Sequence, residues 1–204
     1  YWGLGPKKAI ILPPTAELRC SIKYTAPQQY LVFKSFFPPE FTVYYFGYDP
    51  NFPETHCLDS LISDIAEFIR SELGSATVIG ISYGGLLAIP LVLTHPELVE
   101  RLIMMITAHK ISDSGIILAK KAIEFAEQGN QKELDALFNR LYRRKRWEYL
   151  IRTIGWFTKH SFAKIQNPFT TLINAYKEMI AHNREYDNKI QEINCPVLVV
   201  GGYG

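Results

Sequence analysis

Cysteine is scarce in this chain: three of its 204 residues are cysteines, Cys20, Cys57 and Cys195. Their number is odd and their spacing is wide, which argues against the disulfide framework that staples small secreted domains. We therefore expect reduced, buried thiols and a cytoplasmic protein. No cysteine or histidine cluster has the short spacing of a metal site, and the sequence indicates no metal and no other cofactor.

An excess of charge of one sign is also missing. The chain has 22 Lys and Arg against 20 Asp and Glu, a formal net charge of +2. This net charge is too small to argue for binding to nucleic acid or to an anionic membrane surface. No apolar run reaches the roughly 20 residues that a membrane-spanning helix needs. We therefore expect no nucleic-acid partner and no membrane span, and the sequence leaves the oligomeric state open.

The sequence does contain an alternation of short apolar runs and helical patterns. Before residue 108, strand-like runs alternate with apolar residues at helical spacing, and this alternation is typical of a parallel sheet with helices on both faces. We predict an α/β fold. The expected strands are KKAIIL (7–12), FTVYYFGY (41–48), ATVIGI (76–81) and RLIMMIT (101–107), and the expected helices cover 58–73 and the segment from Tyr83 to the His95-Pro96 pair.

The pattern changes over residues 108–193. No convincing strand occurs there, and four segments with helical spacing follow one another, among them WEYLIRTIGWFTKH at 147–160. Strand-like PVLVV then resumes at 196–200. We therefore predict a core domain made of 1–107 and 194–204, interrupted by an all-helical insertion at 108–193.

A serine between glycines stands where a buried strand meets a helix. In VIGISYGGLLA (78–88), Gly80 and Gly84 flank Ser82 at the Gly-x-Ser-x-Gly spacing. A nucleophile held on a sharp strand-to-helix turn needs small neighbours, because a Cβ would collide with the bend. The alternative is a plain turn in which Ser82 caps the helix.

The stretch GISYGGLLAIPLVLTHPELVERLIMM (80–105) resembles the nucleophile elbow, its helix and the next strand of the α/β-hydrolase superfamily. The His-Pro-Glu after the helix is similar to lid-bearing members such as esterases, C–C hydrolases and proline iminopeptidases. The other strands and the helical block at 108–193 also match the superfamily pattern. The resemblance implies that this block is a lid over the site.

The same resemblance implies roles for individual residues. Ser82 would be the nucleophile that forms an acyl-enzyme, and the backbone N–H of Tyr83 would be one donor of the oxyanion hole. The second donor belongs to the loop after the first strand, where Pro13-Pro14 replaces the usual His-Gly. Proline has no N–H, so the donor would be Thr15.

The acid and the histidine of a triad follow the last strand in this superfamily, and no histidine follows Cys195 here. We expect the natural chain to continue at both ends and to supply them. Within the sequence, His109 and Asp113 are minor candidates, because both follow the strand 101–107 at the edge of the sheet where Ser82 lies.

Three functions remain open at this point. The first is a serine hydrolase that cleaves an ester, thioester or amide of a small apolar acyl group. The second is a binding protein on a hydrolase fold without activity, and the third is an acyltransferase with the same nucleophile. The fold class alone does not separate them.

Overall fold

The structure is a computed structural model and describes residues 1–19, 22–48, 57–141 and 167–201. The predicted helix at 147–160 and Cys20 lie outside these residues. Five strands form one sheet in the order β2-β1-β3-β4-β5, and every neighbouring pair is parallel. The strands are β1 (Lys7–Leu12), β2 (Phe41–Tyr45), β3 (Ala76–Ile81), β4 (Val99–Met105) and β5 (Val197–Val200).

The parallel sheet confirms the predicted α/β class, and all five strands fall where the sequence predicts them. Helices connect the strands, as parallel neighbours require. They are α1 (Ile22–Phe33), α2 (Leu58–Phe68) with its π-helical continuation η2 (Ile69–Leu73), and α3 (Tyr83–Thr94). Gly74 ends the α2–η2 helix at φ 77°, a conformation that glycine adopts readily.

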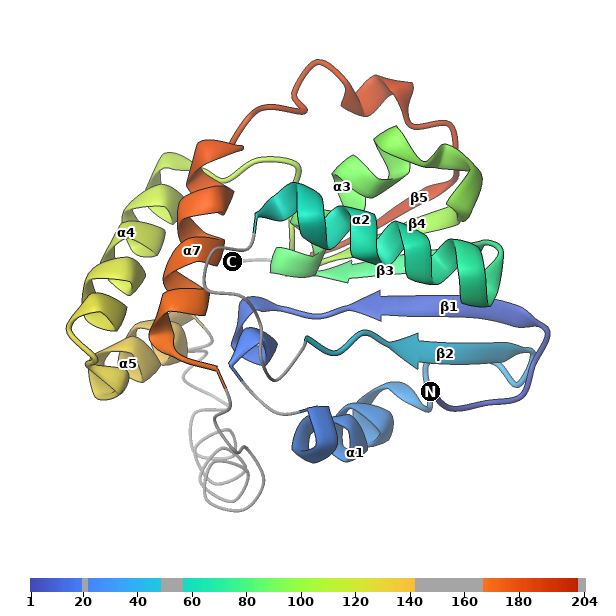
Figure 1. Cartoon of the computed structure of the whole chain (residues 1–204), viewed down its shortest axis with the longest axis horizontal. Coiled ribbons are helices and arrows are strands. Elements are labelled where there is room, and N and C mark those ends of the chain that lie inside the picture. Colours follow the sequence, from blue (N-terminus) through green and yellow to red (C-terminus); the bar gives the residue numbers. More distant parts are fainter. Residues whose placement is uncertain (20–21, 49–56, 142–166, 202–204) are drawn as a thin grey trace.

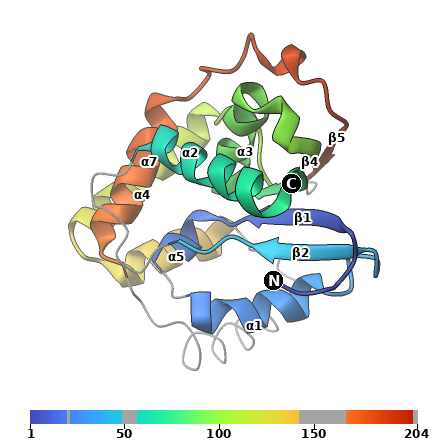
Figure 2. The same ribbon diagram turned by 45° about the vertical axis from the view of Figure 1, so that its right-hand side comes forward.

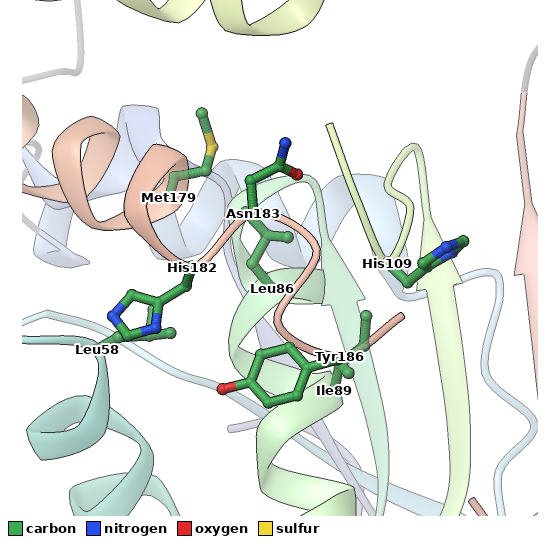
Figure 3. A pocket seen from close by; sticks show the side chains of 8 residues that line it. All are labelled: Leu58, Leu86, Ile89, His109, Met179, His182, Asn183 and Tyr186. Atoms are coloured by element: carbon green, nitrogen blue, oxygen red, sulfur yellow. The ribbon is translucent and has the colours of Figure 1, made fainter. Parts of the chain in front are cut away.

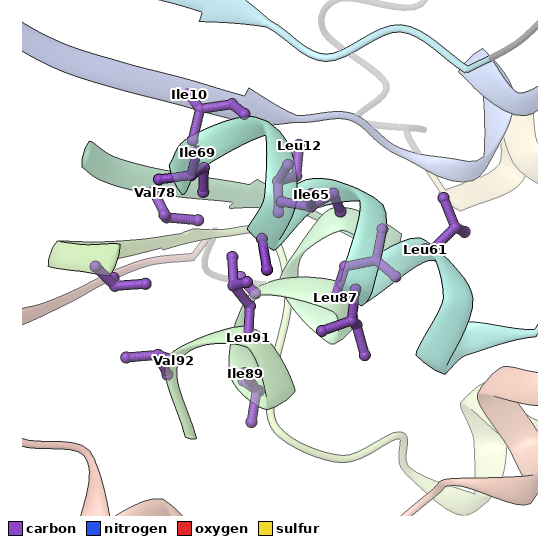
Figure 4. Packing of buried hydrophobic residues seen from close by; sticks show 14 of the residues in the cluster. Ile10, Leu12, Leu61, Ile65, Ile69, Val78, Leu87, Ile89, Leu91 and Val92 are labelled. Atoms are coloured by element: carbon purple, nitrogen blue, oxygen red, sulfur yellow. The ribbon is translucent and has the colours of Figure 1, made fainter. Parts of the chain in front are cut away.

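Alternate residues of the central strands enter two separate hydrophobic clusters, one on each face of the sheet. Ile10 and Leu12 of β1 pack with α2 and α3, whereas Ala9 and Ile11 pack with Phe33 at the end of α1. This alternation follows from the period of two along a strand. Figure 4 shows the α2–α3 side, where α2 and α3 bury their apolar side chains against β1 and β3.

The described part of 108–193 is helical, as expected, and contains no strand. It consists of α4 (Asp113–Glu127), α5 (Gln131–Leu141), α7 (Phe169–Ala181) and a short 3-10 turn, η4 (Ile190–Glu192). These three helices lie together beyond the carboxyl ends of β1, β2 and β3 (Figures 1 and 2). They share a small hydrophobic cluster of their own, built from Ala119, Ala122, Leu134, Leu137, Leu172 and Tyr176.

The expectation of buried cysteines is wrong for the thiols that the structure describes. Cys57 is exposed just before α2, and Cys195 is half-buried just before β5. Both thiols are free. Both residues lie on connecting segments rather than on a core-facing strand or helix, and connecting segments run over the surface.

In the described ranges, no helix combines the length and the apolar character that crossing a membrane requires. The most apolar helix of the described residues is α3, which has 12 residues and packs in the core cluster beside α2 on one face of the sheet. Its uniform hydrophobicity is therefore explained by burial inside the core domain.

Candidate active site

Ser82 occupies the single residue between β3 and α3, and its backbone is strained. Its φ of 52° and ψ of −113° lie where residues with a side chain are rare. Two backbone hydrogen bonds hold this conformation: the Ser82 N–H donates to the Met105 carbonyl at 3.0 Å, and the Ser82 carbonyl accepts from Gly85 N–H at 2.9 Å. The Ser82 side chain makes no capping hydrogen bond, so the plain helix-cap interpretation is not supported.

The two glycines of the motif are required by close backbone contacts. A Cβ on Gly80 would lie 2.5 Å from the Cα of Gly85, and a Cβ on Gly84 would overlap the carbonyl oxygen of Leu12. The first turn of α3 therefore presses directly on the ends of β3 and β1. This contact places the start of α3 next to the loop that follows Leu12.

That loop carries the predicted oxyanion residue Thr15. Thr15 is the first residue of a short 3-10 helix, η1 (Thr15–Leu18), which follows directly after Pro13 and Pro14. The first N–H groups of a helix have no partner inside it, which holds for Thr15 in η1 and for Tyr83 in α3. The Thr15 hydroxyl lies 3.3 Å from the hydroxyl of Tyr176 on α7.

Two buried tyrosines, Tyr48 and Tyr83, pack beside the Thr15 loop and the start of α3. Burial raises the pKa of Tyr48, and the hydroxyl of Tyr48 donates to the Pro13 carbonyl at 3.4 Å. Burial also raises the pKa of the Tyr83 phenol, and the Glu178 carboxylate adds to the rise. Sequence reasoning assigned a role to the backbone of Tyr83 but none to Tyr48. No motif marks Tyr48, because its partner lies 35 residues away.

The minor candidates His109 and Asp113 follow β4 but have different surroundings. The Nε2 of His109 lies 3.4 Å from Oδ1 of Asp187, which makes a histidine–carboxylate pair. Asp113 begins α4 with a side chain that is 91% exposed, and its Oδ1 lies 3.9 Å from Arg184 Nη2. Within the described ranges, no hydrogen bond joins either residue to Ser82.

A pocket opens one helical turn beyond Ser82, between α3, α7, the start of α2 and the loop after β4 (Figure 3). Four of its lining side chains are apolar and four carry polar atoms. The lining residues are Leu58, Leu86, Ile89, His109, Met179, His182, Asn183 and Tyr186. In Figure 3 the imidazole of His109 points away from His182 and Leu58.

Metal-ligating side chains do not converge anywhere in the described residues: they contain no group of three His, Cys, Asp or Glu that could hold an ion. The backbone N–H groups at the start of α3, directly after Ser82, are suited to stabilise a negative charge that develops on a nearby oxygen atom.

No family model matches this chain, and no curated protein sequence matches it significantly. Solved structures do resemble it. A hydrolase from Pseudomonas aeruginosa is 18% identical with a TM-score of 0.73, over 98% of this chain and 74% of that one. An α/β hydrolase from a deep-sea metagenome library of the Medee basin is 14% identical with a TM-score of 0.70, over 98% and 72%.

A structure from a study of carboxylesterases of the thaumarchaeon Nitrososphaera gargenis is 16% identical, with a TM-score of 0.67. It is matched over 95% of this chain and 71% of that one. At such identities the likeness is one of fold. The chain therefore has the α/β-hydrolase fold that its serine motif predicts.

Proposed function

We propose that the protein is a serine hydrolase that cleaves an ester, thioester or amide of a small apolar acyl group. The observation that carries this proposal is the strained backbone of Ser82, with φ 52°, at the end of β3 and the start of α3. Strain of this kind costs free energy and persists where the surrounding structure enforces it, which is common at catalytic positions.

In this proposal the Ser82 hydroxyl attacks the acyl carbonyl, and the leaving group departs to give an acyl-enzyme. The backbone N–H groups of Tyr83 and Thr15 donate hydrogen bonds to the oxyanion that forms. Water then attacks the acyl-enzyme and releases the acid. Pro14 contributes no N–H, so Thr15 is the first donor that the loop offers.

The attack needs a base, since a serine hydroxyl is a weak nucleophile by itself. We propose that the histidine and the acid follow β5, in the order that the superfamily resemblance implies. His109, paired with Asp187, is the competing candidate within the described residues. Replacing His109 by alanine therefore separates the two: labelling of Ser82 should persist unless His109 is the base.

The helices α4, α5 and α7 support the proposal of a lid at 108–193, because they lie beyond the carboxyl ends of the strands, where open α/β sheets bind their ligands. Apolar side chains such as Leu86 and Met179 line the neighbouring pocket, and they support an acyl group without charge. The carboxylesterase among the structures with this fold is consistent with an ester substrate.

The test is labelling of the full-length protein by a fluorophosphonate, together with hydrolysis of p-nitrophenyl butyrate. Ser82→Ala should abolish labelling and lower kcat by at least about a thousandfold, since loss of the nucleophile removes the triad pathway. Ser75→Ala is the matched control, because Ser75 precedes the other end of β3 and its hydroxyl donates to Glu100 at 2.7 Å. It should label as the wild type does.

The two other functions are outcomes of the same test. A folded full-length protein that resists the probe and leaves the ester intact would be a binding protein on a hydrolase fold. A protein that labels at Ser82 but transfers the acyl group to an added alcohol or thiol faster than to water would be an acyltransferase.

A further inference from the structure

A buried asparagine attaches the loop that carries Thr15 to the helical segment formed by α4, α5 and α7. Asn167 is 3% exposed and lies just before α7. Its Nδ2 donates to the Leu18 carbonyl at 2.7 Å, and its backbone N–H donates to the Arg19 carbonyl at 3.4 Å. Its own carbonyl accepts from Arg19 Nε at 3.3 Å. One residue of the helical segment thus makes three hydrogen bonds with the end of η1.

Arg19 extends the same attachment to two helices. Its Nη1 donates to the side-chain oxygen of Gln131 at the start of α5, at 2.6 Å. Its guanidinium lies over the ring of Phe169, the first residue of α7, 3.7 Å from the ring centroid. Arginine combines planar stacking and several donors in one group, which lysine does not. We call Arg19, Asn167, Gln131 and Phe169 the η1 clamp.

The η1 clamp restrains the carboxyl end of η1, which is a short helix. The last carbonyls of a helix have no partner inside it, and those of Leu18 and Arg19 are the ones that Asn167 satisfies. The side chain of Leu18 is fully buried in the core cluster. At the other end, the Tyr48 hydroxyl donates to Pro13. Both ends of the segment that contains Thr15 are therefore fixed.

We infer that Arg19 and Asn167 are positioning residues that set the direction of the Thr15 N–H, so that the helical segment controls the oxyanion hole. This inference rests on the proposed function, because it assigns the clamp a role in that reaction. Neither residue touches the substrate in this account. They act through Thr15, whose own hydroxyl faces Tyr176 of α7.

The kinetic test uses Arg19→Met and Asn167→Ala in the full-length protein, with p-nitrophenyl butyrate as substrate. Oxyanion stabilisation acts in the transition state, so kcat should fall about tenfold to a hundredfold while KM changes less than about twofold. The affinity for an alkyl boronic acid, whose adduct on Ser82 places an oxygen in the hole, should fall by the same factor as kcat. Arg19→Lys should restore only a small part of the loss.

Lys177→Met is the matched control. Lys177 is an exposed cation on α7 that lies 3.4 Å from Glu127 of α4. Its loss should leave kcat and the boronic acid affinity unchanged. A merely structural weakening would lower the unfolding midpoint without this coupled loss. If both clamp variants stay folded and keep kcat and the boronic acid affinity within twofold, the inference is wrong.

Hydrogen exchange provides a readout that does not depend on activity. The Glu17 N–H donates to the Pro14 carbonyl at 3.0 Å and reports on η1. Its exchange should become about tenfold faster in both clamp variants and stay unchanged in Lys177→Met. Unchanged exchange in the clamp variants would overturn the inference even in an active enzyme. Absence of Ser82 labelling in the wild type would instead overturn the proposed function, and faster exchange would then assign the clamp a structural role alone.

Discussion

The elbow around Ser82 and the helical segment of α4, α5 and α7 are held in place by different means. At the elbow the contacts are between backbone atoms. Gly84 packs against the Leu12 carbonyl, and the N–H and C=O groups of Ser82 both make backbone hydrogen bonds. The helical segment meets the core partly through single polar side chains, such as Asn167 and Glu178. The position of Ser82 is therefore insensitive to side-chain motion, whereas the helical segment can be loosened by the loss of single contacts.

The first prediction tests the backbone side of this comparison and has the largest expected effect. Gly84→Ala places a methyl group on the Leu12 carbonyl, which belongs to a central strand and has no room to move. We expect the free energy of unfolding to fall by about 3 kcal/mol, as measured by urea denaturation. Gly129→Ala is the control: a Cβ there meets nothing within 4 Å, so only its φ of 64° costs free energy, about 1 kcal/mol.

A similar loss of unfolding free energy in both glycine variants would mean that the elbow is not tightly packed. It would contradict the view that backbone contacts fix the position of Ser82. A larger loss at Gly84 alone would confirm that steric contact fixes the turn. Far-ultraviolet circular dichroism before denaturation should show that both variants are folded.

The second prediction tests the side-chain attachment of α7. The Glu178 carboxylate accepts from the N–H of Leu58 at 3.0 Å, and so caps the start of α2 from another helix. Glu178→Ala should lower the free energy of unfolding by about 1–2 kcal/mol, because the Leu58 N–H loses its partner. Glu127→Ala, which removes an exposed ion pair with Lys177, should cost less than about 1 kcal/mol. Equal losses would contradict the role of Glu178 as a cap.

The third prediction concerns pH and has the smallest expected effect. The side chain of Glu185 accepts a hydrogen bond from His182 and raises the pKa of that histidine, and the Glu178 and Asp59 carboxylates act in the same direction. A pKa raised in the folded state means that protonation stabilises the fold. This contribution is complete below the unfolded pKa of about 6.5 and is lost as the pH rises through the folded pKa.

The measurement is the difference in unfolding free energy between the wild type and His182→Gln. This difference should be larger near pH 5.5 than near pH 9, and below about 1 kcal/mol because the pair is partly exposed. A difference that grows with rising pH would contradict the sign of the argument and would show that His182 is neutral in the folded protein.

The strands and the elbow could be predicted from the sequence because their signals are local. Buried parallel strands are short apolar runs, and the glycines around Ser82 lie within two residues of it. The helix α1 was not predicted, since it contains Pro27 and lacks a clear apolar face. The burial of the cysteines was predicted wrongly, because composition does not say whether a residue falls on a strand or on a connecting segment.

The η1 clamp could not be predicted for a different reason. Asn167 and Leu18 are 149 residues apart, and no periodicity or motif links an asparagine before one helix to a carbonyl after a distant strand. Such pairings depend on how the helical segment lies on the core, which a single sequence does not encode in a readable pattern. His109 is an intermediate case: its place after β4 was predicted, but its partner Asp187 was not.

The position of the helical segment between β4 and β5 also bears on the order of folding. Met105 of β4 pairs with Val200 of β5, so this pairing closes a loop that contains all the residues between the two strands. Closing a loop of roughly ninety residues costs about 4 kcal/mol of chain entropy. β1, β3 and β4 need shorter closures, so we expect them to assemble first, with the Ser82 turn already formed. Asn167 and Phe169 are synthesised much later, and the η1 loop can be locked only when they arrive. A nascent chain would thus hold the strained Ser82 turn before the proposed oxyanion hole is complete.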